Sequence, residues 1–377
     1  MSNSVPSLTL GVEEEYFIVD PTSRDLVKEP DEAMLSRCEE KFPGQVSPEF
    51  IRCQLEIGTK VCNSVAEVRS QLVSLRSGIA DVCNDYSLAP IAASTHPFAR
   101  WKDHQHTQKE RYLQLAENMQ AIANRMLIGG MHIHVGIEDE DLRIDLLNQF
   151  TYFLPHLLAL SCSSPFWHGY KTGLDCYRLT VFNDMPRTGL PSRFESFSEY
   201  KRHAQVLINA GIIEDDTKLW WDIRPSGKYP TLEVRIMDIC TQVEHAVSIV
   251  ALVQSLFLTL YRLKERNVRW RVYRKMLIEE NRWRAMRYGV SGSLIDFGKG
   301  ELVKYAELQD EFINEVQEAA IELGCLDEVN AARNIVANGS SAKQQVAVYD
   351  KALHAGATEQ EALNAVVDWM IAETVKF

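Results

Sequence analysis

Leu8-Thr-Leu-Gly-Val-Glu-Glu-Glu-Tyr-Phe-Ile-Val19 is the stretch of this chain that decides its fold. It predicts a β-strand, because β-branched and aromatic residues run from a Ser/Pro lead-in to the turn signal Asp20-Pro21. Side chains alternate between the faces of a strand, so Glu13 and Glu15 share one face and Glu14 lies on the other. Two carboxylates on one face repel each other unless a cation lies between them. Taken alone, the stretch fits an exposed edge strand with solubilising charge equally well.

Three later stretches repeat this design of one apolar and one polar face. In the last part of Val46–Thr59, Leu55 and Ile57 share one face and Gln54 and Glu56 lie on the other, with Glu49 near the strand entrance. The polar faces of the four predicted strands hold, in chain order, Glu13 and Glu15, Glu56, His132 and His134, and Glu233 and Arg235. Each set also has a structural interpretation, since strand histidines are often hydrogen-bonded structural residues and a Glu–Arg pair is often a surface ion pair.

Side by side, these polar faces predict a metal site. A half-buried antiparallel sheet is covered by helices on its apolar face, and the other face here gathers four glutamates, two histidines and one arginine. Such a cluster is unstable by like-charge repulsion unless metal ions are part of it. Oxygen-rich ligation with one or two histidines suits Mg²⁺ or Mn²⁺ better than Zn²⁺, and an adjacent arginine suits a phosphoryl group. The hypothesis is therefore phosphoryl transfer on a metal-loaded sheet; the alternative is four unrelated polar strand faces.

The composition excludes several other classes of protein. The 377 residues are 46% apolar and carry a formal net charge of −12, which argues against a nucleic-acid partner. We expect no membrane span, because the apolar run Val247–Leu260 is short and contains Gln254. The start of the chain lacks the pattern of a signal peptide, and the eight cysteines form no CxxC motif. These features predict a soluble, cytoplasmic protein with reduced thiols.

The remaining pattern predicts one α+β domain over residues 1–377. A sheet-based core covers about residues 8–290 and a helical part covers about 301–377. Ser64–Glu67 is a capping box that opens a helix, Val243–Leu263 predicts a buried helix, and Asp175–Phe182 is predicted to be a strand. The amphipathic C-terminal helices leave two alternatives open, internal packing and a homodimer interface.

Six short motifs occur in an order and spacing that resemble a known family. They are Gly11-Val-Glu-Glu-Glu15, Thr95-His-Pro-Phe98, Gly130-Met-His-Ile-His-Val-Gly136, Ser163-Ser-Pro165, Trp221-Asp-Ile-Arg-Pro-Ser226 and Thr231-Leu-Glu-Val-Arg235. Together they resemble the bacterial carboxylate–amine ligase family, also called glutamate–cysteine ligase type 2, of the glutamine synthetase-like superfamily. The resemblance runs from about Leu8 to Gly289 and continues more weakly to the end. Each motif alone is weak, whereas the ordered set is specific.

The resemblance implies a curved antiparallel sheet with helices on one face and divalent metals and ATP on its concave face. The metal ligands that it implies are Glu13, Glu15, Glu56, His132 and Glu233, with Glu49 assisting. Arg235, which would stabilise the γ-phosphoryl group, and Glu56 are the candidate catalytic residues. Arg178, Arg224 and His134 are candidates for substrate binding, because arginine offers a bidentate fork to carboxylates. Both arginines are equally suited to structural ion pairs.

The activity implied by the resemblance is an ATP-dependent ligase that joins glutamate to an amino acid such as cysteine, or to another amine. ATP phosphorylates a substrate carboxylate, and the amine then attacks the acyl phosphate. Two alternatives stay open: a metallohydrolase built on the His/Glu cluster, and an inactive relative that binds a nucleotide or amino acid. Glu14 departs from the family pattern, in which this position is often apolar. The sequence leaves open whether Glu14 lies at the strand edge or pairs with a basic residue.

Overall fold

The computed structural model describes residues 5–377 as an α+β fold around a seven-stranded antiparallel sheet. The strands of the sheet are β1 (Leu10–Val19), β2 (Val46–Pro48), β3 (Gln54–Gly58), β4 (Ala89–Ile91), β5 (Met131–Gly136), β10 (Ile223–Pro225) and β11 (Thr231–Val234). Their order is β10-β11-β5-β1-β3-β2, and β4 pairs with the far end of β1. The α+β class and the antiparallel sheet predicted from the sequence are confirmed.

The strand register brings the predicted polar residues onto one face of the sheet. Glu13 of β1 lies opposite His132 of β5, and Glu15 of β1 lies opposite Glu56 of β3. On the other side of β5, Glu233 lies opposite His134. Because directly paired residues point to the same face, four strands that are distant in sequence contribute to one polar surface.

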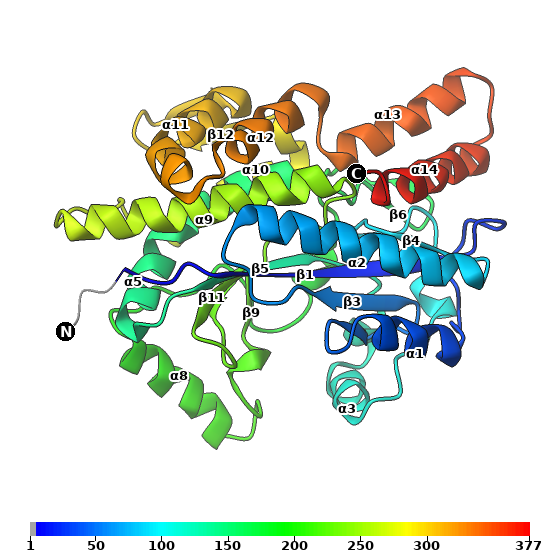
Figure 1. The fold of residues 1–377 in the computed structure, drawn as a ribbon, viewed down its shortest axis with the longest axis horizontal. Helices are drawn as coiled ribbons and strands as arrows, with labels where there is room; N and C mark the ends of the chain where they lie inside the picture. The colour runs from blue at the N-terminus through cyan, green and yellow to red at the C-terminus, as the bar shows by residue number, and fades with distance from the viewer. Residues whose placement is uncertain (1–4) are drawn as a thin grey trace.

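The apolar face of the sheet is covered by α2 (Val65–Asp85) and α9 (Val243–Glu265), as Figure 1 shows. Val12, Ile133 and Val234 from three strands are fully buried in one core cluster with the apolar stripes of both helices. The helices α11 (Tyr305–Leu323) and α12 (Leu326–Asn338) pack on α9 from beyond, so most of α9 is surrounded by protein. By length and composition α9 could span a membrane, since its most apolar window has a mean hydropathy of 1.7. In this fold, however, 83% of that window is buried inside the protein. It is a core helix here.

The polar face of the sheet is flanked by other elements. Helices α3 (Glu110–Met119) and α8 (Phe197–Asn209) lie on this side, away from α2 and α9 (Figure 1). Towards the end of β1 the same face turns apolar, where Phe17 and Val19 pack with Ile91 of β4 and with α14 (Glu359–Thr374). The polar surface is thus bounded by apolar packing at one end.

The other elements connect and cover these layers. The helices are α1 (Glu32–Lys41), α4 (Ala121–Asn124), α5 (Glu140–Phe150), α6 (Leu154–Ser161), α7 (Arg178–Phe182), α10 (Lys275–Tyr288) and α13 (Ser341–His354), with short 3₁₀ turns η1 (Trp101–Asp103), η2 (Thr151–Phe153), η3 (Asp216–Lys218) and η4 (Gly289–Ser291). Three small two-stranded sheets are formed by β6 (Phe166–Trp167) with β7 (Tyr170–Lys171), β8 (Thr188–Gly189) with β9 (Trp220–Trp221), and β12 (Ser293–Asp296) with β13 (Glu301–Lys304).

The strand predicted at Asp175–Phe182 is wrong, because this segment contains the short helix α7. The β-branched pair Thr180-Val181 favoured a strand, but a tertiary contact decides the local conformation. The Ser164 hydroxyl accepts a hydrogen bond from the backbone N–H of Arg178 at 3.0 Å and so satisfies the first turn of α7. Because this hydrogen-bond partner lies fourteen residues earlier in the chain, the residues of the segment itself give no sign that a helix begins there.

Candidate active site

A pocket of about 360 Å³ lies over the polar face of the sheet. Its floor is formed by the polar residues of β1, β3, β5 and β11, and its walls come from α3, α7, η3 and the hairpin between β10 and β11. All the residues that the sequence singled out as functional line it: Glu13, Glu15, Glu49, Glu56, His132, His134, Arg178, Arg224, Glu233 and Arg235. The four predicted polar strand faces therefore form one site rather than four unrelated surfaces.

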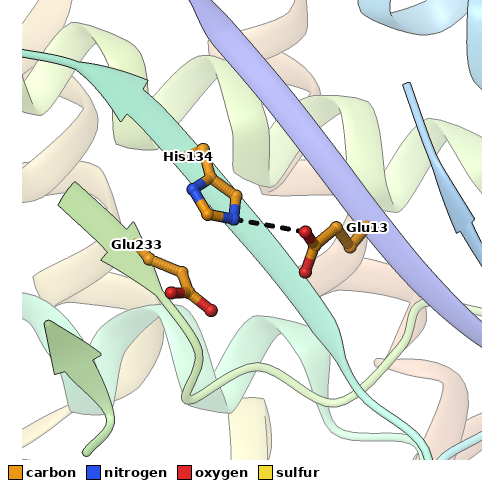
Figure 2. Close-up of side chains that lie close together, drawn as sticks. All are labelled: Glu13, His134 and Glu233. Carbon is orange, nitrogen blue, oxygen red and sulfur yellow. Dashed lines mark ion pairs between the residues drawn. The ribbon is translucent and has the colours of Figure 1, made fainter. Parts of the chain in front are cut away.

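Glu13, His134 and Glu233 are the group best placed to hold a metal ion among the described residues. One ligand atom from each lies within 4.8 Å of the others. Figure 2 shows the three side chains converging from β1, β5 and β11, with Glu13 Oε1 3.4 Å from His134 Nε2. His134 Nδ1 lies 3.0 Å from Thr231 Oγ1, which fixes the ring orientation. Apart from its approach to Glu13, His134 Nε2 has no polar partner, so it is free to turn to a ligand shared with Glu13.

His132 lies beside this group and faces a different set of partners. Its Nδ1 is 3.1 Å from Glu13 Oε2 and 3.4 Å from a guanidinium nitrogen of Arg235. Burial, followed by the positive charge of Arg235, lowers the pKa of His132 to about 4, so the ring is neutral at pH 7. Burial by itself would raise the pKa of Glu13, but its contacts with His132 at 3.1 Å and His134 at 3.4 Å outweigh burial and hold that pKa below the usual range.

Glu233 is held between two arginines. Arg224, opposite it on β10, donates from Nε and a terminal nitrogen at 2.8 and 3.2 Å, and Arg235 also bonds to it. Although burial alone would raise the pKa of Glu233, the charges of Arg235 and Arg224 hold it below the usual range. Arg224 donates further to the carbonyls of Thr217 and Leu219. The structure thus shows Arg224 as an ion-pair partner, and its predicted contact with substrate stays a prediction.

A second group of carboxylates lies at the β1–β3 end of the pocket. Their pKa values are raised, whereas those of Glu13 and Glu233 are lowered. Burial, and then the nearby charge of Glu49, raises the pKa of Glu15 to about 7. Burial, and then the negative charges of Glu49, Glu13 and Glu15, raise the pKa of Glu56 well above its usual value. Glu49 is itself raised by burial and accepts a hydrogen bond from Tyr112 at 3.2 Å. Arginines near these carboxylates offset their mutual repulsion only in part, so the donor set fits a hard divalent cation such as Mg²⁺ or Mn²⁺.

Arg178 is placed in the wall of the pocket by backbone acceptors. Its terminal nitrogens lie 3.1 to 3.4 Å from the carbonyls of Arg235, Ile236 and Met237, just beyond the end of β11. Its Nε is buried without a partner, and so is the Nε of Arg235. Two arginines that line the pocket therefore each have one donor without a protein partner.

Glu14 settles the question that the sequence left open, since it pairs with a basic residue on the far side of the sheet. Its carboxylate receives Arg76 of α2 at 2.6 and 3.0 Å and the Tyr16 hydroxyl, and both charged side chains are fully buried. The pair lies under the sheet, away from the pocket, and so takes no part in the site.

Several pocket residues were missed by the sequence analysis. Arg111 and Tyr112 of α3 and Lys228 and Tyr229 of the β10–β11 hairpin line the opening, and Tyr229 packs edge-on against His134 with ring centroids 6.1 Å apart. They lie on segments without the two-residue alternation that marked the sheet. Their place beside the pocket follows from the tertiary structure, and the sequence held no signal for it.

Comparisons with known proteins agree on one family. The model of glutamate–cysteine ligase family 2 matches residues 9–368. A relative from Rhodospirillum rubrum is 53% identical, covering 98% of this chain and 96% of its own length, and one from Jannaschia sp. is 50% identical, covering 96% of each. Both carry the name "Putative glutamate--cysteine ligase 2".

Solved structures extend the likeness to the fold. The glutamate–cysteine ligase of Francisella tularensis, solved in complex with AMP, matches with a TM-score of 0.69 at 13% identity, covering 98% of this chain and 89% of that one. The bifunctional glutathione synthetase of Pasteurella multocida matches with a TM-score of 0.70 at 14% identity, covering 97% of this chain and 52% of that one. At these identities the likeness concerns the fold alone.

Proposed function

This chain belongs to glutamate–cysteine ligase family 2, whose members are ATP-dependent carboxylate–amine ligases, and we propose that it joins glutamate to cysteine or a related amine. A glutamate carboxylate oxygen takes the γ-phosphoryl group of ATP, and ADP leaves. The amine nitrogen then forms a bond to the activated carbon, phosphate leaves, and the nitrogen gives up protons to yield an amide. The net products are the amide, ADP and phosphate.

The observation that carries this proposal is the composition of the pocket floor. One continuous surface of four strands presents Glu13, Glu56 and Glu233 with Arg235 among them. Phosphoryl transfer needs positive charge around the transferred group, and Arg235 has an unsatisfied buried Nε to offer it. A metallohydrolase is a poorer fit, because a fixed cation beside a hydroxide-generating metal adds repulsion.

The residues of the floor fit a divalent cation, and we propose Mg²⁺ or Mn²⁺. Glu13, Glu233 and His134 would hold it at one end, and Glu15, Glu49 and Glu56 would hold a second at the other, with His132 orienting Glu13. Bound there, such an ion would neutralise the phosphate oxygens of ATP. The assignment moves His134 from the predicted substrate contacts to the metal ligands, because it converges with Glu13 and Glu233. It also moves His132 from the predicted metal ligands to a role in orienting Glu13.

Other parts of the proposal follow the family. We propose that the pocket side of the sheet is the concave, ATP-binding face of a glutamine synthetase-like fold, and that Arg178 contacts a substrate carboxylate through its unsatisfied Nε. A cytoplasmic location is supported by eight cysteines that are all buried and unpaired. Within the described residues the C-terminal helices pack internally, and a homodimer stays a prediction.

The test is phosphate release from Mg·ATP with glutamate, with amino acids and small amines scanned as acceptors. We expect release that needs both glutamate and an acceptor. Replacing Arg235 by Ala should lower kcat by about 10² to 10³, the usual cost of losing one preorganised donor to a developing charge. Arg235→Lys should recover part of the rate, and Arg202→Ala, an exposed arginine of α8 outside the pocket, should keep the wild-type rate.

Two outcomes would contradict the proposal. Release that needs no glutamate would indicate an ATPase, and no release with any pair would lead to a hydrolase assay with Zn²⁺. Because the Arg235 side chain is only 13% exposed, urea unfolding of each variant separates a lost catalytic contact from a lost fold.

A further inference from the structure

Arg282 and Asp222 form a buried ion pair behind the candidate active site, and neither of them lines the pocket. Arg282 lies on α10, and Asp222 directly precedes β10. The guanidinium donates from Nε at 2.7 Å and from a terminal nitrogen at 3.2 Å to the two oxygens of the Asp222 carboxylate. The side chains of Arg282 and Asp222 are 8% and 1% exposed, so a bidentate pair is almost completely removed from water.

The backbone of Asp222 connects this pair to Arg235. Its carbonyl accepts a hydrogen bond from the N–H of Arg235 at 2.8 Å, and its N–H donates to the carbonyl of Gly189 in β8 at 2.9 Å. The bond to Arg235 extends the β10–β11 ladder by one residue beyond the pair of Ile223 with Val234. Asp222 is therefore held at its side chain and at both backbone groups, and it fixes the point at which the chain turns away from β11 into Arg235.

The same strand carries a second link to the pocket floor. Arg224 lies two residues after Asp222 on β10, opposite Glu233, and donates to its carboxylate. The start of β10 thus sets the position of Arg235 through a backbone bond and the position of Glu233 through Arg224. Arg282 is the side chain that attaches this start of β10 to α10, and it also donates to Asn183, directly after α7, at 3.2 Å.

The chemistry of the pair suits positioning better than stabilisation. A buried ion pair adds little to the stability of a fold, because the cost of desolvating two charges offsets most of their attraction. Two parallel N–H···O bonds do, however, fix one orientation of the carboxylate. Within residues 5 to 377 the Asp222 carboxylate bonds only to Arg282, and the other terminal nitrogen of Arg282 meets only Met286 Sδ, at 3.6 Å.

We infer that Arg282 is a positioning residue for phosphoryl transfer: through Asp222 it holds Arg235 where the guanidinium meets the transferred group. Arg282 does not touch the pocket, so it acts only through Asp222 and the start of β10. The inference rests on the proposed function of Arg235 and gives α10, which lies outside the pocket, a part in the reaction. Because Arg235 acts on charge that develops in the transition state, its displacement lowers kcat rather than substrate binding.

The experiment separates the position of Arg235 from the stability of the fold. Arg282→Met leaves the Asp222 carboxylate buried and unpaired, so both kcat and the free energy of unfolding should fall. We expect kcat to fall about tenfold to a hundredfold, the cost of a displacement of about 1 Å, with the KM for ATP within about twofold of the wild type. Adding Asp222→Leu removes the unpaired charge, so stability should recover. The low kcat should remain, because the anchor of the Asp222 backbone is still missing.

Two further variants complete the set. Arg282→Lys keeps a charged donor for Asp222 and should restore part of kcat. Arg284→Met is the matched control on the same helix: Arg284 donates to the carbonyl of Ser293 at 2.6 Å and does not line the pocket. Its kcat should equal that of the wild type. Urea unfolding measures the stability of every variant.

The outcomes separate this inference from the proposed function. If kcat recovers together with stability in the double variant, or if Arg282→Met raises the KM for ATP and leaves kcat unchanged, the positioning role is overturned and the ligase stands. Absence of turnover by the wild type with every acceptor would contradict the ligase instead. Crystal structures of the wild type and the double variant then decide the point. A shift of the Arg235 guanidinium by about 1 Å or more supports the inference, and superimposable pockets overturn it.

Discussion

Three consecutive glutamates show how strongly the environment of a side chain determines its chemistry. Glu13 is held ionised by two histidines, and Glu15 has a pKa raised to about 7 by burial and by Glu49. Glu14, between them, lies on the opposite face in a buried pair with Arg76. Only the alternation of side chains along β1 separates the residues of the site from those of the core. A shift of register by one residue would therefore place Glu14 in the site and bury Glu13 and Glu15.

His96, in the Thr95–Phe98 motif, shows the same dependence for an imidazole. Its Nε2 lies 2.8 Å from the carbonyl of Arg24, and its Nδ1 accepts hydrogen bonds from the backbone N–H groups of Phe98 and Ala99. Only the neutral ring with its proton on Nε2 satisfies all three groups. Burial, against the opposing charge of Asp25, lowers the pKa of His96 from 6.5 to about 4.

We predict that His96 makes the protein less stable in mild acid. Between pH 6.5 and 4 the unfolded chain binds this proton and the folded one does not, so stability is lost as the pH falls through that window. From pH 7.5 to 5.0 the contribution is about 2 kcal/mol. Urea unfolding at both pH values measures it.

The matched variant is His96→Asn, whose side-chain oxygen can accept from Phe98 and Ala99 but does not titrate. Its stability should fall less between pH 7.5 and 5.0 than that of the wild type, by about the same 2 kcal/mol. Equal losses in both proteins would show that other groups account for the acid sensitivity.

At the scale of elements, the junction of β5 with β1 aligns the two ends of the site. The backbone N–H of Gly130, just before β5, donates to Glu15 Oε2 at 2.7 Å. The guanidinium of Arg178 packs directly against Gly130, and it holds the carbonyls that follow β11. A glycine at this position lets Arg178 pack against the residue whose N–H holds Glu15 while it also donates to the carbonyl of Arg235.

We predict that Gly130→Ala damages activity more than stability. The new Cβ would lie 2.4 Å from a terminal nitrogen of Arg178, so the guanidinium must leave its backbone acceptors. We expect a loss of about 1–3 kcal/mol in the free energy of unfolding. The kcat/KM should fall about tenfold to a hundredfold, because misplaced site residues are costly.

Gly58→Ala on β3 is the control for this variant. Its Cβ would meet nothing within 4 Å, although Gly58 lies opposite Glu13 in the same sheet. We expect wild-type kinetics and stability within about 0.5 kcal/mol of the wild type. If Gly130→Ala behaves like Gly58→Ala, Arg178 does not brace the site.

At the scale of the whole molecule, the buried guanidinium of Arg76 joins four parts of the chain. From α2 it reaches Glu14 of β1, the carbonyls of Cys240 and Thr241 before α9, and the carbonyl of Thr374 in α14. Thr374 Oγ1 in turn accepts a hydrogen bond from the backbone of Ala92, beyond β4. The sheet and the C-terminal helix thus meet at one charged residue.

We predict that Arg76→Met is among the most destabilising single changes in the chain. Removing one partner leaves Glu14 charged and buried, at a cost of about 3–5 kcal/mol in the free energy of unfolding. The double variant Glu14→Leu with Arg76→Met should be more stable than Arg76→Met alone, because it leaves no unpaired charge. Urea unfolding of the three proteins tests this, and a double variant less stable than the single one would contradict it.

Much of the site was predictable because it is built on strands. Two-residue alternation at Glu13/Glu15, Glu56, His132/His134 and Glu233 identified the polar faces, and the ordered motifs identified the family; both are confirmed by the sheet register and the family match. The metal ligands, the substrate contacts, the single domain, the cytoplasmic location and a homodimer stay predictions. Helix α7 was missed, since its first turn is satisfied by a distant serine.

The sequence by itself determined which strand residues face the pocket and which face the core, because strand periodicity is a local property of the backbone. It also determined the family and the ligase class. Only the tertiary structure decided the partners: that Glu14 meets Arg76, that Arg224 holds Glu233, that His134 converges with Glu13 and Glu233, and that Arg111 lies over the opening. The physical reason is that a side-chain partner is chosen by packing between segments far apart in the chain, and no local pattern records that choice.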